Sequence, residues 1–503
     1  MNTKLLRQKI LDLAIRGKLT DQRKSDGTAA DLLKDIAEAK PKKNGVILNG
    51  ARSAKSKDPK QIIPLDKSEA PFEIPDNWEW VKLGDLCNAS SGKTPSTSQK
   101  EFWNGNVLWV TSKDVKQKYI DSTQICLSDL GASSMQLYPP KTMIIVGRSG
   151  ILRHSLPVAI LKKGATINQD LKALVFKDDR VVEFVYSVIK GMEQHLLHEY
   201  KKAGTTVDNL NFDLFLTAPI PLPPLAEQQR IVAKIEEAFA EIDAVEKNKD
   251  LLKTHIKQTR QKILDLAIHG KLVPQDENDE PASVLLEKIL QEKAQSDNKK
   301  SLKKKKTDDI STSDKRPYEK VEDIPFEIPE NWMWVRLGEL SETIQYGYNA
   351  PAQASGRIKM VRISDIYENK IVWNTVPFCD INENEIPAYL LKENDILFAR
   401  TGGTVGKSYI VDNLPEESVY AGYLIRTRYG KNINAHYMKY FMESGLYWEQ
   451  LRKGCIATAQ PNCNGKTLGK MQIPLPPLNE QSRIVSKIEE LFSTLEQMER
   501  NLI

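Results

Sequence analysis

One long uninterrupted helix is the feature that most constrains this chain. The segment from Leu225 to His269 contains no proline or glycine, whereas Pro223 and Pro224 precede it and Gly270 follows it. Proline has no N–H group to donate within a helix and glycine commonly ends one, so these residues predict where the helix begins and ends. About 45 residues at 1.5 Å each make a rod of roughly 68 Å, which is longer than one compact domain requires.

Apolar residues of this helix recur at alternating spacings of four and three positions. Nine of the eleven positions in this series are apolar. This is the 3.5-residue period of a coiled coil, and it predicts a partner helix. A single amphipathic helix lying on a sheet is the alternative interpretation. The series comprises Ile231, Ile235, Ala238, Ile242, Val245, Lys249, Leu252, Ile256, Thr259, Ile263 and Leu266.

The chain is also internally duplicated, with an offset of about 253 residues. Three long matches at nearly one offset predict two halves of one architecture. The matches pair residues 220–239 with 473–492 (16 of 20 identical), 7–19 with 260–272 (12 of 13 identical) and 71–86 with 325–340 (12 of 16 identical).

The duplicated segments predict the partner of the long helix. Its apolar seam continues near the C-terminus and then near the N-terminus, so the two ends of the chain would meet and rebuild that helix in two pieces. The expected result is a long antiparallel two-helix coiled coil with pseudo-twofold symmetry and a circular arrangement of the chain. The seam positions in the two end segments are Ile484, Ile488, Leu491, Leu495, Met498, Leu502, Leu6, Ile10 and Leu13.

Between the helices, residues 88–215 and 342–468 differ in sequence although their flanks are nearly identical. Both contain short β-rich runs and one helical stretch, which predicts the α+β class with two mixed α/β domains. The expected strands are 107–110, 143–146, 173–176, 359–363, 396–399 and 424–428, and the expected helices are 29–39, 181–200, 282–293 and 435–452.

A pair of tryptophans opens each half, Trp78 with Trp80 and Trp332 with Trp334, at alternate positions as in a strand. Such rings can stack on bases, but at the start of a duplicated domain we expect them to anchor the core.

Composition restricts the possible partners and the cellular compartment of the chain. The net charge of +5 permits nucleic acid as a partner without requiring it. Five cysteines form no CxxC pair, which favours a reducing cytoplasm. No run approaches the ~18 apolar residues of a membrane span, and the charged N-terminal segment is unlike a signal peptide.

The motif PLPPLxEQxRIVxKIEE occurs twice before a long helix, and LDLAIxGKL also occurs twice. Together they strongly resemble the specificity subunit of type I restriction–modification enzymes, and the resemblance covers the whole chain. It implies two target recognition domains, each reading one half of an asymmetric bipartite DNA sequence. The helical regions would set their separation and dock two modification (methyltransferase) subunits, which restriction (motor and nuclease) subunits would join.

The resemblance further implies a non-catalytic chain with no cofactor or metal of its own, with S-adenosylmethionine, ATP and Mg on partner subunits. It implies the following division: 1–19, an N-terminal helix completing the distal helical region; 20–70, a short helix and basic linker; 71–219, the first recognition domain; 220–272, the central helical region; 273–324, a short helix and flexible Lys-rich linker; 325–472, the second recognition domain; and 473–503, the C-terminal helical region.

Candidate DNA contacts follow from side-chain chemistry, because arginine favours guanine and asparagine or glutamine favours adenine. The loop arginines Arg148 and Arg400 match each other in the two halves, each close to glycine, which lets backbone approach phosphate. For each residue taken singly, a solvated loop side chain is the alternative. The candidates are Ser112, Lys113, Arg148, Arg153 and His154 in the first domain and Tyr346, Tyr348, Arg362, Arg400, Lys407, Gln460, Asn462 and Asn464 in the second.

Four polar residues at the start of the long helices, Gln228, Arg230, Gln481 and Arg483, lie off the seam and are expected to be free to dock another chain.

Catalytic motifs are weak. Thr401–Ser408 resembles a phosphate-binding loop but lacks its first glycine, and the adenine methyltransferase signature is absent from the sequence. A stand-alone DNA-modifying enzyme, or a coiled-coil scaffold without DNA binding, remain the alternatives to a DNA-recognition subunit.

Overall fold

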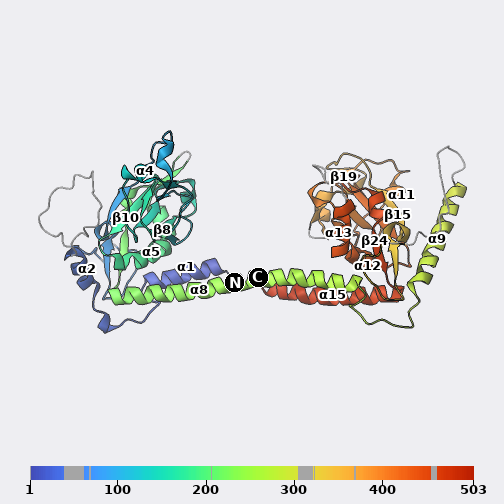
Figure 1. The fold of residues 1–503 in the computed structure, drawn as a ribbon, viewed down its shortest axis with the longest axis horizontal. Helices are drawn as coiled ribbons and strands as arrows, with labels where there is room; N and C mark the ends of the chain where they lie inside the picture. The colour runs from blue at the N-terminus through green and yellow to red at the C-terminus, as the bar shows by residue number, and fades with distance from the viewer. Residues whose placement is uncertain are drawn as a thin grey trace. The chain divides into compact units, whose positions relative to one another are not determined.

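The computed structural model describes residues 2–38, 62–66, 70–204, 207–303, 321, 323–367, 370–454 and 462–502 (Figure 1). These residues form two compact units, Met1–Asn248 and Lys249–Ile503. The boundary between the units falls inside helix α8, Leu225–Ile268, which begins directly after Pro224 as the sequence predicts. Within the predicted linker regions 20–70 and 273–324, residues 39–61 and 304–320 lie outside the described residues.

A mixed five-stranded sheet in the order β2-β10-β6-β8-β4 forms the centre of the first unit, and a smaller sheet, β5-β3-β9, accompanies it. Apolar runs such as β6 are buried at every position, because the sheet is covered on both faces. The strands are β2 (Cys87–Ser91), β3 (Trp103–Val110), β4 (Tyr119–Ile120), β5 (Cys126–Leu127), β6 (Met143–Val146), β8 (Val158–Leu161), β9 (Ala165–Ile167) and β10 (Leu171–Phe176).

The remaining elements of this unit cover the sheet or link it to the long helix. Helix α5 buries Phe184, Val185 and Val188 in the core that also holds Met143 and Ile145 of the sheet. These elements are α1 (Thr3–Ile15), α2 (Ala29–Glu38), β1 (Glu79–Lys82), α3 (Leu83–Leu86), α4 (Asp129–Ser133), β7 (Arg148–Ser149), α5 (Val182–Gly191), α6 (Glu193–Tyr200), β11 (Lys201–Lys202), β12 (Asp208–Leu210), α7 (Phe212–Phe215) and β13 (Pro219–Leu222).

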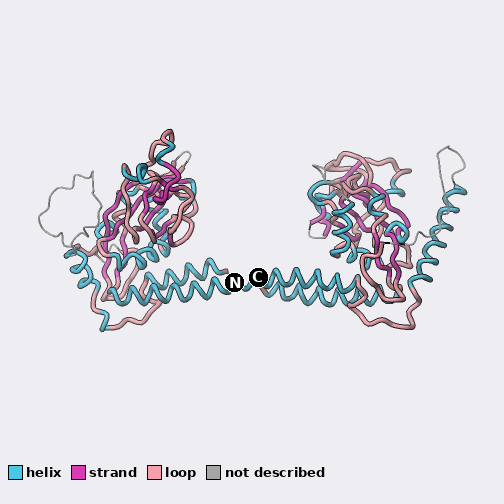
Figure 2. The backbone as a smooth tube through the Cα atoms, in the orientation of Figure 1, coloured by secondary structure: helices cyan, strands magenta, loops and turns pink. Residues whose placement is uncertain are grey.

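The second unit repeats this plan with an antiparallel sheet in the order β15-β23-β20-β21 and a smaller sheet, β19-β16-β22. The tube in Figure 2 shows the strands of this unit above its long helix pair, with shorter helices among them. Its elements are α9 (Ala282–Lys303), β14 (Met333–Arg336), α10 (Leu337–Leu340), β15 (Ser341–Tyr346), β16 (Ile358–Val361), β17 (Ile366–Tyr367), β18 (Lys370–Ile371), β19 (Phe378–Cys379), α11 (Ile386–Tyr389), β20 (Ile396–Ala399), β21 (Ser408–Ile410), β22 (Ser418–Tyr420), β23 (Leu424–Tyr429), α12 (Ala435–Phe441), α13 (Gly445–Gly454), α14 (Gly465–Gly469), β24 (Gln472–Leu475) and α15 (Leu478–Asn501).

The duplicated tryptophan motif pairs with the proline segment that precedes each long helix. Strand β1 is antiparallel to β13, with Trp80 opposite Pro221, and β14 is antiparallel to β24, with Trp334 opposite Pro474. Proline is tolerated there because each sheet has only two strands, so both strands are edges. Trp78, Trp80, Trp332 and Trp334 are all buried, which confirms their prediction as core anchors.

Each unit contains its own helix pair. In the first unit Arg7 of α1 forms ion pairs with Asp243 (2.6 Å) and Glu246 (3.1 Å) of α8, so α1 runs along the first part of that helix (Figure 1). In the second unit Arg260 of α8 approaches Glu496 (3.9 Å) and Glu499 (3.7 Å) of α15. Exposed pairs of this kind contribute little stability, and burial of apolar residues contributes more.

The predicted seam is buried in part. Within α8 the seam residues Ile231, Ile242, Ile256 and Ile263 are buried, but Val245 is 47% exposed. In α15, Ile484, Ile488 and Leu495 of the predicted series are buried, but Met498 is 48% exposed. Helix α1 instead buries Leu11, Ala14 and Ile15, because it also packs against α5 of its own domain.

Three predicted helices differ from the structure. Residues 181–200 form two helices rather than one, since α5 ends at Gly191, a poor helix former, and α6 begins after Met192. Residues 435–452 are likewise divided, and Ser444 caps the second helix by accepting from the amide of Tyr447 at 3.3 Å. Helix α9 extends to Lys303, ten residues beyond the prediction, because neither proline nor glycine interrupts it.

No helix in the described part of the chain is both long enough and apolar enough to cross a membrane.

Candidate nucleic-acid interface

The loop that follows β20 holds Arg400 against an aromatic ring. The guanidinium carbon of Arg400 lies 4.7 Å from the centre of the Tyr346 ring, at the end of β15. The Tyr346 hydroxyl accepts a hydrogen bond from the amide of Gly465 at 2.9 Å, which fixes the ring, although 40% of this residue stays exposed. Arginine can stack its planar guanidinium flat on an aromatic face, whereas lysine can place only a compact charge there.

Segments far apart in sequence fix the backbone of this loop. The Arg400 amide donates to the carbonyl of Tyr423 at 3.2 Å, and the Arg400 carbonyl accepts from Cys463 at 2.9 Å. Thr401 forms an isolated bridge with Asn462, so two predicted contacts, Arg400 and Asn462, lie side by side. Asn464 has a structural task, because its carbonyl oxygen caps α14 by accepting from the amide of Thr467 at 2.9 Å.

The two arginines matched by sequence do not occupy equivalent positions. Leu171 pairs with Val146 in the first unit, and Leu424 pairs with Ala399 in the second, so the strands align at an offset of 253. Gly147 is therefore the counterpart of Arg400, and Arg148 lies one residue further along. A shift of one residue exchanges the two faces of a strand. The predicted equivalence of Arg148 and Arg400 is wrong for this reason.

Lys172 is a basic residue of the first domain that the sequence reasoning missed. Its Nζ atom donates to the hydroxyl of Ser91 at 2.6 Å and lies 5.2 Å from the centre of the Phe212 ring. In strand pairing Ser91 lies opposite Lys172, as Tyr346 lies opposite Ile425 in the second unit. Because the counterpart of Lys172 is an isoleucine, comparison of the repeats gave no signal for it.

The other candidates of the first domain are spread over two loops. Ser112 and Lys113 lie in a turn closed by Asp114, which accepts from the amide and the hydroxyl of Thr111, both at 2.8 Å. Arg148, Arg153 and His154 are exposed in and after β7. Arg153 lies 3.8 Å from the carboxylate of Asp208, which reduces the charge it can offer to phosphate.

Two candidates of the second domain are held by internal contacts. Arg362 forms an ion pair with Asp365 at 2.8 Å, and this hydrogen bond raises the pKa of Arg362. Tyr348 is half-buried, with its ring 5.2 Å from that of Tyr389. Lys407 is exposed after the loop of Arg400, and Gln460 lies outside the described residues.

The glutamines expected to dock another chain are not free. Gln228 and Gln481 are buried, and their side-chain amides donate to the carbonyls of Pro223 (2.8 Å) and Pro476 (3.0 Å). The carbonyl oxygen of Gln481 also accepts from the amide of Asn434 at 2.9 Å. Both positions lie off the helix seam, but they face their own domain, so the prediction of free side chains is wrong.

The two arginines of this set are also engaged within their own units. Arg230 pairs with Asp26 and Arg483 pairs with Asp279, each at 2.6 Å. Their side chains remain 25% and 35% exposed, so each arginine retains an accessible edge beside its carboxylate.

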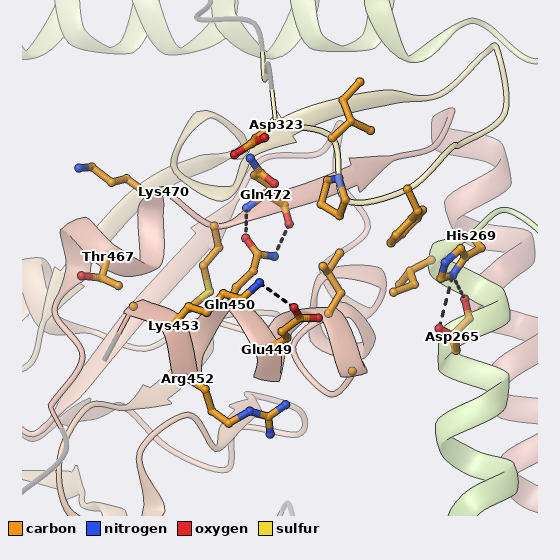
Figure 3. Close-up of a pocket in the computed structure, with 18 residues that line it drawn as sticks. Asp265, His269, Asp323, Glu449, Gln450, Arg452, Lys453, Thr467, Lys470 and Gln472 are labelled. Atoms are coloured by element: carbon orange, nitrogen blue, oxygen red, sulfur yellow. Dashed lines mark hydrogen bonds and ion pairs between the residues drawn. The ribbon is translucent and has the colours of Figure 1, made fainter. Parts of the chain in front are cut away.

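A cleft of about 960 Å³ lies in the second unit between the end of α8 and helices α13 and α14 (Figure 3). Gln450 spans its floor, donating to the carbonyl of Gln472 at 2.8 Å and accepting from its amide at 2.7 Å. Lys453 is paired with Glu449 at 2.7 Å. None of the predicted DNA contacts that the structure describes lines this cleft.

Catalytic arrangements find little support in the geometry. Thr401–Ser408, the segment that resembles a phosphate-binding loop, forms a short 3-10 turn that leads into strand β21. A true phosphate-binding loop would be followed by a helix. Within the described ranges, no group of three or more His, Cys, Asp or Glu side chains is placed to hold a metal ion.

Comparison with known proteins agrees with this arrangement. The family model described as type I restriction modification DNA specificity domain matches residues 75–254 and 329–503. The chain is 26% identical to the specificity subunit of the type I restriction enzyme EcoAI from Escherichia coli, over 98% of this chain and 89% of that protein. It is 25% identical to the corresponding EcoEI subunit from Escherichia coli, over 99% and 90%.

Solved structures show a similar fold. One, described as the structural basis of complex assembly and conformational transition of the type I R-M system, has a TM-score of 0.56 at 18% identity, covering 86% of this chain and 94% of that chain. The HsdS subunit from Thermoanaerobacter tengcongensis has a TM-score of 0.50 at 19% identity, covering 87% and 94%. The chain therefore belongs to the type I restriction–modification DNA specificity family, and it acts as a specificity subunit that recognises DNA.

Proposed function

We propose that this specificity subunit reads a bipartite, asymmetric DNA sequence, with the domain of each unit contacting one half-site. The observation that supports this proposal is that the two units share one framework but differ in their surface residues. The tryptophan motifs pair in matching registers in both units. At the ends of the matching central strands, however, the first unit has Gly147 and Lys172 where the second has Arg400 and Ile425. One scaffold with two different recognition surfaces suits two different half-sites.

We propose that the long helix sets the distance between the two half-sites. Helix α8 contributes to both units, and it pairs with α1 in one and with α15 in the other. We propose that these pairs form an antiparallel coiled coil with a circular arrangement of the chain. Two reading domains address the same face of a duplex when the half-sites lie about 34–36 Å apart, or a multiple of this distance.

The chemistry of the complex belongs to partner chains in this proposal. Two modification subunits dock on the helical regions, and restriction subunits join through them. S-adenosylmethionine, ATP and Mg bind to those partners, while this chain supplies the sequence specificity and catalyses no step. The proposed setting is the cytoplasm, where the DNA substrate is present. The proposal is supported by the names of the relatives and by the structure that describes assembly of a type I system.

Genome-wide detection of methylated adenines tests this function. Cells that carry the chain with its neighbouring modification subunit should show one methylated bipartite sequence with two unlike half-sites. Deleting only the gene for this chain should abolish methylation of that sequence. Persistence of the methylation, or a methylated sequence with a single undivided site, would contradict the proposal.

A further inference from the structure

We propose that Arg400 reads one guanine of the half-site bound by the second domain, while Gly403 beside it admits the DNA backbone. This inference rests on the proposed function, and it assigns a base and a specificity-determining residue to one of the two surfaces. The first domain has the same glycine but not the arginine, so its half-site is read without this contact.

Arg400 is held in place before any ligand binds. Its backbone is fixed on both sides by Tyr423 and Cys463, and its guanidinium lies on the Tyr346 ring, which is itself held by Gly465. The Nε atom of Arg400 is buried and donates to no described residue. A long side chain that is already ordered loses less entropy when it forms two hydrogen bonds at once.

The charge of Arg400 is also uncommitted. Arg362 and Arg428 of the same domain are paired with Asp365 (2.8 Å) and Asp395 (2.6 Å), respectively. No carboxylate among the described residues forms such a pair with Arg400. A planar guanidinium with free donors matches the O6 and N7 acceptors of guanine in the major groove. Tyr423, which is 66% exposed at the same edge, adds an aromatic surface beside it.

Gly403 is a glycine that the fold itself does not require. A Cβ atom at this position would meet nothing within 4 Å, and its backbone avoids the left-handed region that favours glycine. Gly402 differs, because its φ of +76° explains its identity. A glycine without an internal reason suits close approach of an external backbone, here the DNA phosphates.

The first domain repeats the glycine and lacks the arginine. Gly150 is the counterpart of Gly403 at the offset of 253, and a Cβ atom there would also meet nothing within 4 Å. At Gly147, the counterpart of Arg400, a Cβ atom would lie 3.1 Å from the side chain of Lys172. The glycines therefore give both domains the same approach to the phosphates, and the neighbouring side chains distinguish the bases.

The test compares methylated sequences in cells that carry the full chain, with its modification partners, as wild type, Arg400→Lys, Arg400→Gln, Gly403→Ala or Gly445→Ala. Gly445 is the matched control, because a Cβ atom there also meets nothing within 4 Å and the residue lines the cleft beside α13, which Arg400 and Gly403 do not line. We expect both Arg400 variants to lose about tenfold or more selectivity for guanine at one position of one half-site, with the other half-site unchanged.

Gly403→Ala should slow methylation at every target sequence without altering the sequence, and Gly445→Ala should behave as wild type. Equal amounts of each variant in the cell, checked by immunoblot, exclude a folding defect. An unchanged sequence in both Arg400 variants would overturn the assignment. Complete loss of methylation in both, at normal chain levels, would also overturn it, because Arg400 would then supply affinity rather than base selection. If the wild type itself yields no bipartite sequence, the proposed function fails instead.

Discussion

The indole Nε1 of Trp78 donates a hydrogen bond of 2.9 Å to Oε2 of Glu227, and Trp332 makes the same bond to Glu480 at 2.9 Å. Both carboxylates are fully buried in the first turn of a long helix. In the first unit Gln22 donates to the other oxygen of Glu227 at 2.5 Å. The bond thus ties the tryptophan motif, the segment after α1 and the long helix into one structure, and the duplication repeats it.

Removing this acceptor should destabilise the first unit. Glu227→Ala leaves the buried indole N–H of Trp78 and the amide of Gln22 without their acceptor, so we expect a loss of about 1–3 kcal/mol in the free energy of unfolding. Urea unfolding followed by tryptophan fluorescence measures the change. Glu241→Ala, at an exposed position of the same helix, should stay within about 0.5 kcal/mol of wild type. Equal losses in the two variants would contradict the account.

The same carboxyl groups predict a pH dependence. Burial raises the pKa of Glu227 and Glu480 above the ordinary 4.5, and hydrogen bonds from tryptophan and glutamine only partly oppose it. Such a group binds its proton more tightly in the folded chain, so it lowers the free energy of unfolding as the pH rises from 4.5 through the raised pKa.

A variant without these two titrating groups isolates their effect. The double variant Glu227→Gln, Glu480→Gln cannot titrate at either position. We expect the stability of wild type relative to this variant to decrease between pH 4 and pH 7, as measured by urea unfolding at each pH. A difference that stays constant, or that grows with pH, would contradict the direction of the shift.

The buried glutamines should act on stability rather than on docking, and to different degrees. Gln481 uses both ends of its side chain, with Pro476 and Asn434, whereas the carbonyl oxygen of Gln228 is buried without a hydrogen-bond partner among the described residues. Gln481→Ala should therefore cost about 1–3 kcal/mol and Gln228→Ala less. Unfolding of both variants measures this, and a larger loss for Gln228→Ala would contradict it.

Much of the framework could be predicted from sequence because it depends on local patterns. Strands β6 and β20 have the bounds that their apolar runs predict, and α8 begins directly after Pro224. The end of α5 at Gly191 was missed because apolar periodicity continues through it into α6. Gln228 and Gln481 were misassigned because a position off the helix seam can face either solvent or a domain packed against the helix, and the sequence does not distinguish the two.

The recognition surface could be predicted only in part, because strand register decides it. Matching identical residues aligned Arg148 with Arg400, whereas the strand registers of the two units align Gly147 with Arg400. Lys172 gave no signal, since its repeat counterpart is Ile425 and its role depends on contacts with Ser91 and Phe212. Only the folded strands bring these side chains together.

The length of α8 provides the most direct test of the central claim, that one helix sets the distance between two different half-sites. Removing seven residues, 245–251, shortens a helix by about 10.5 Å and keeps its faces nearly in phase. Mapping methylated adenines in cells that carry this variant should recover the same two half-sites separated by a shorter spacer. Recovery of the same half-sites with an unchanged spacer would contradict the claim.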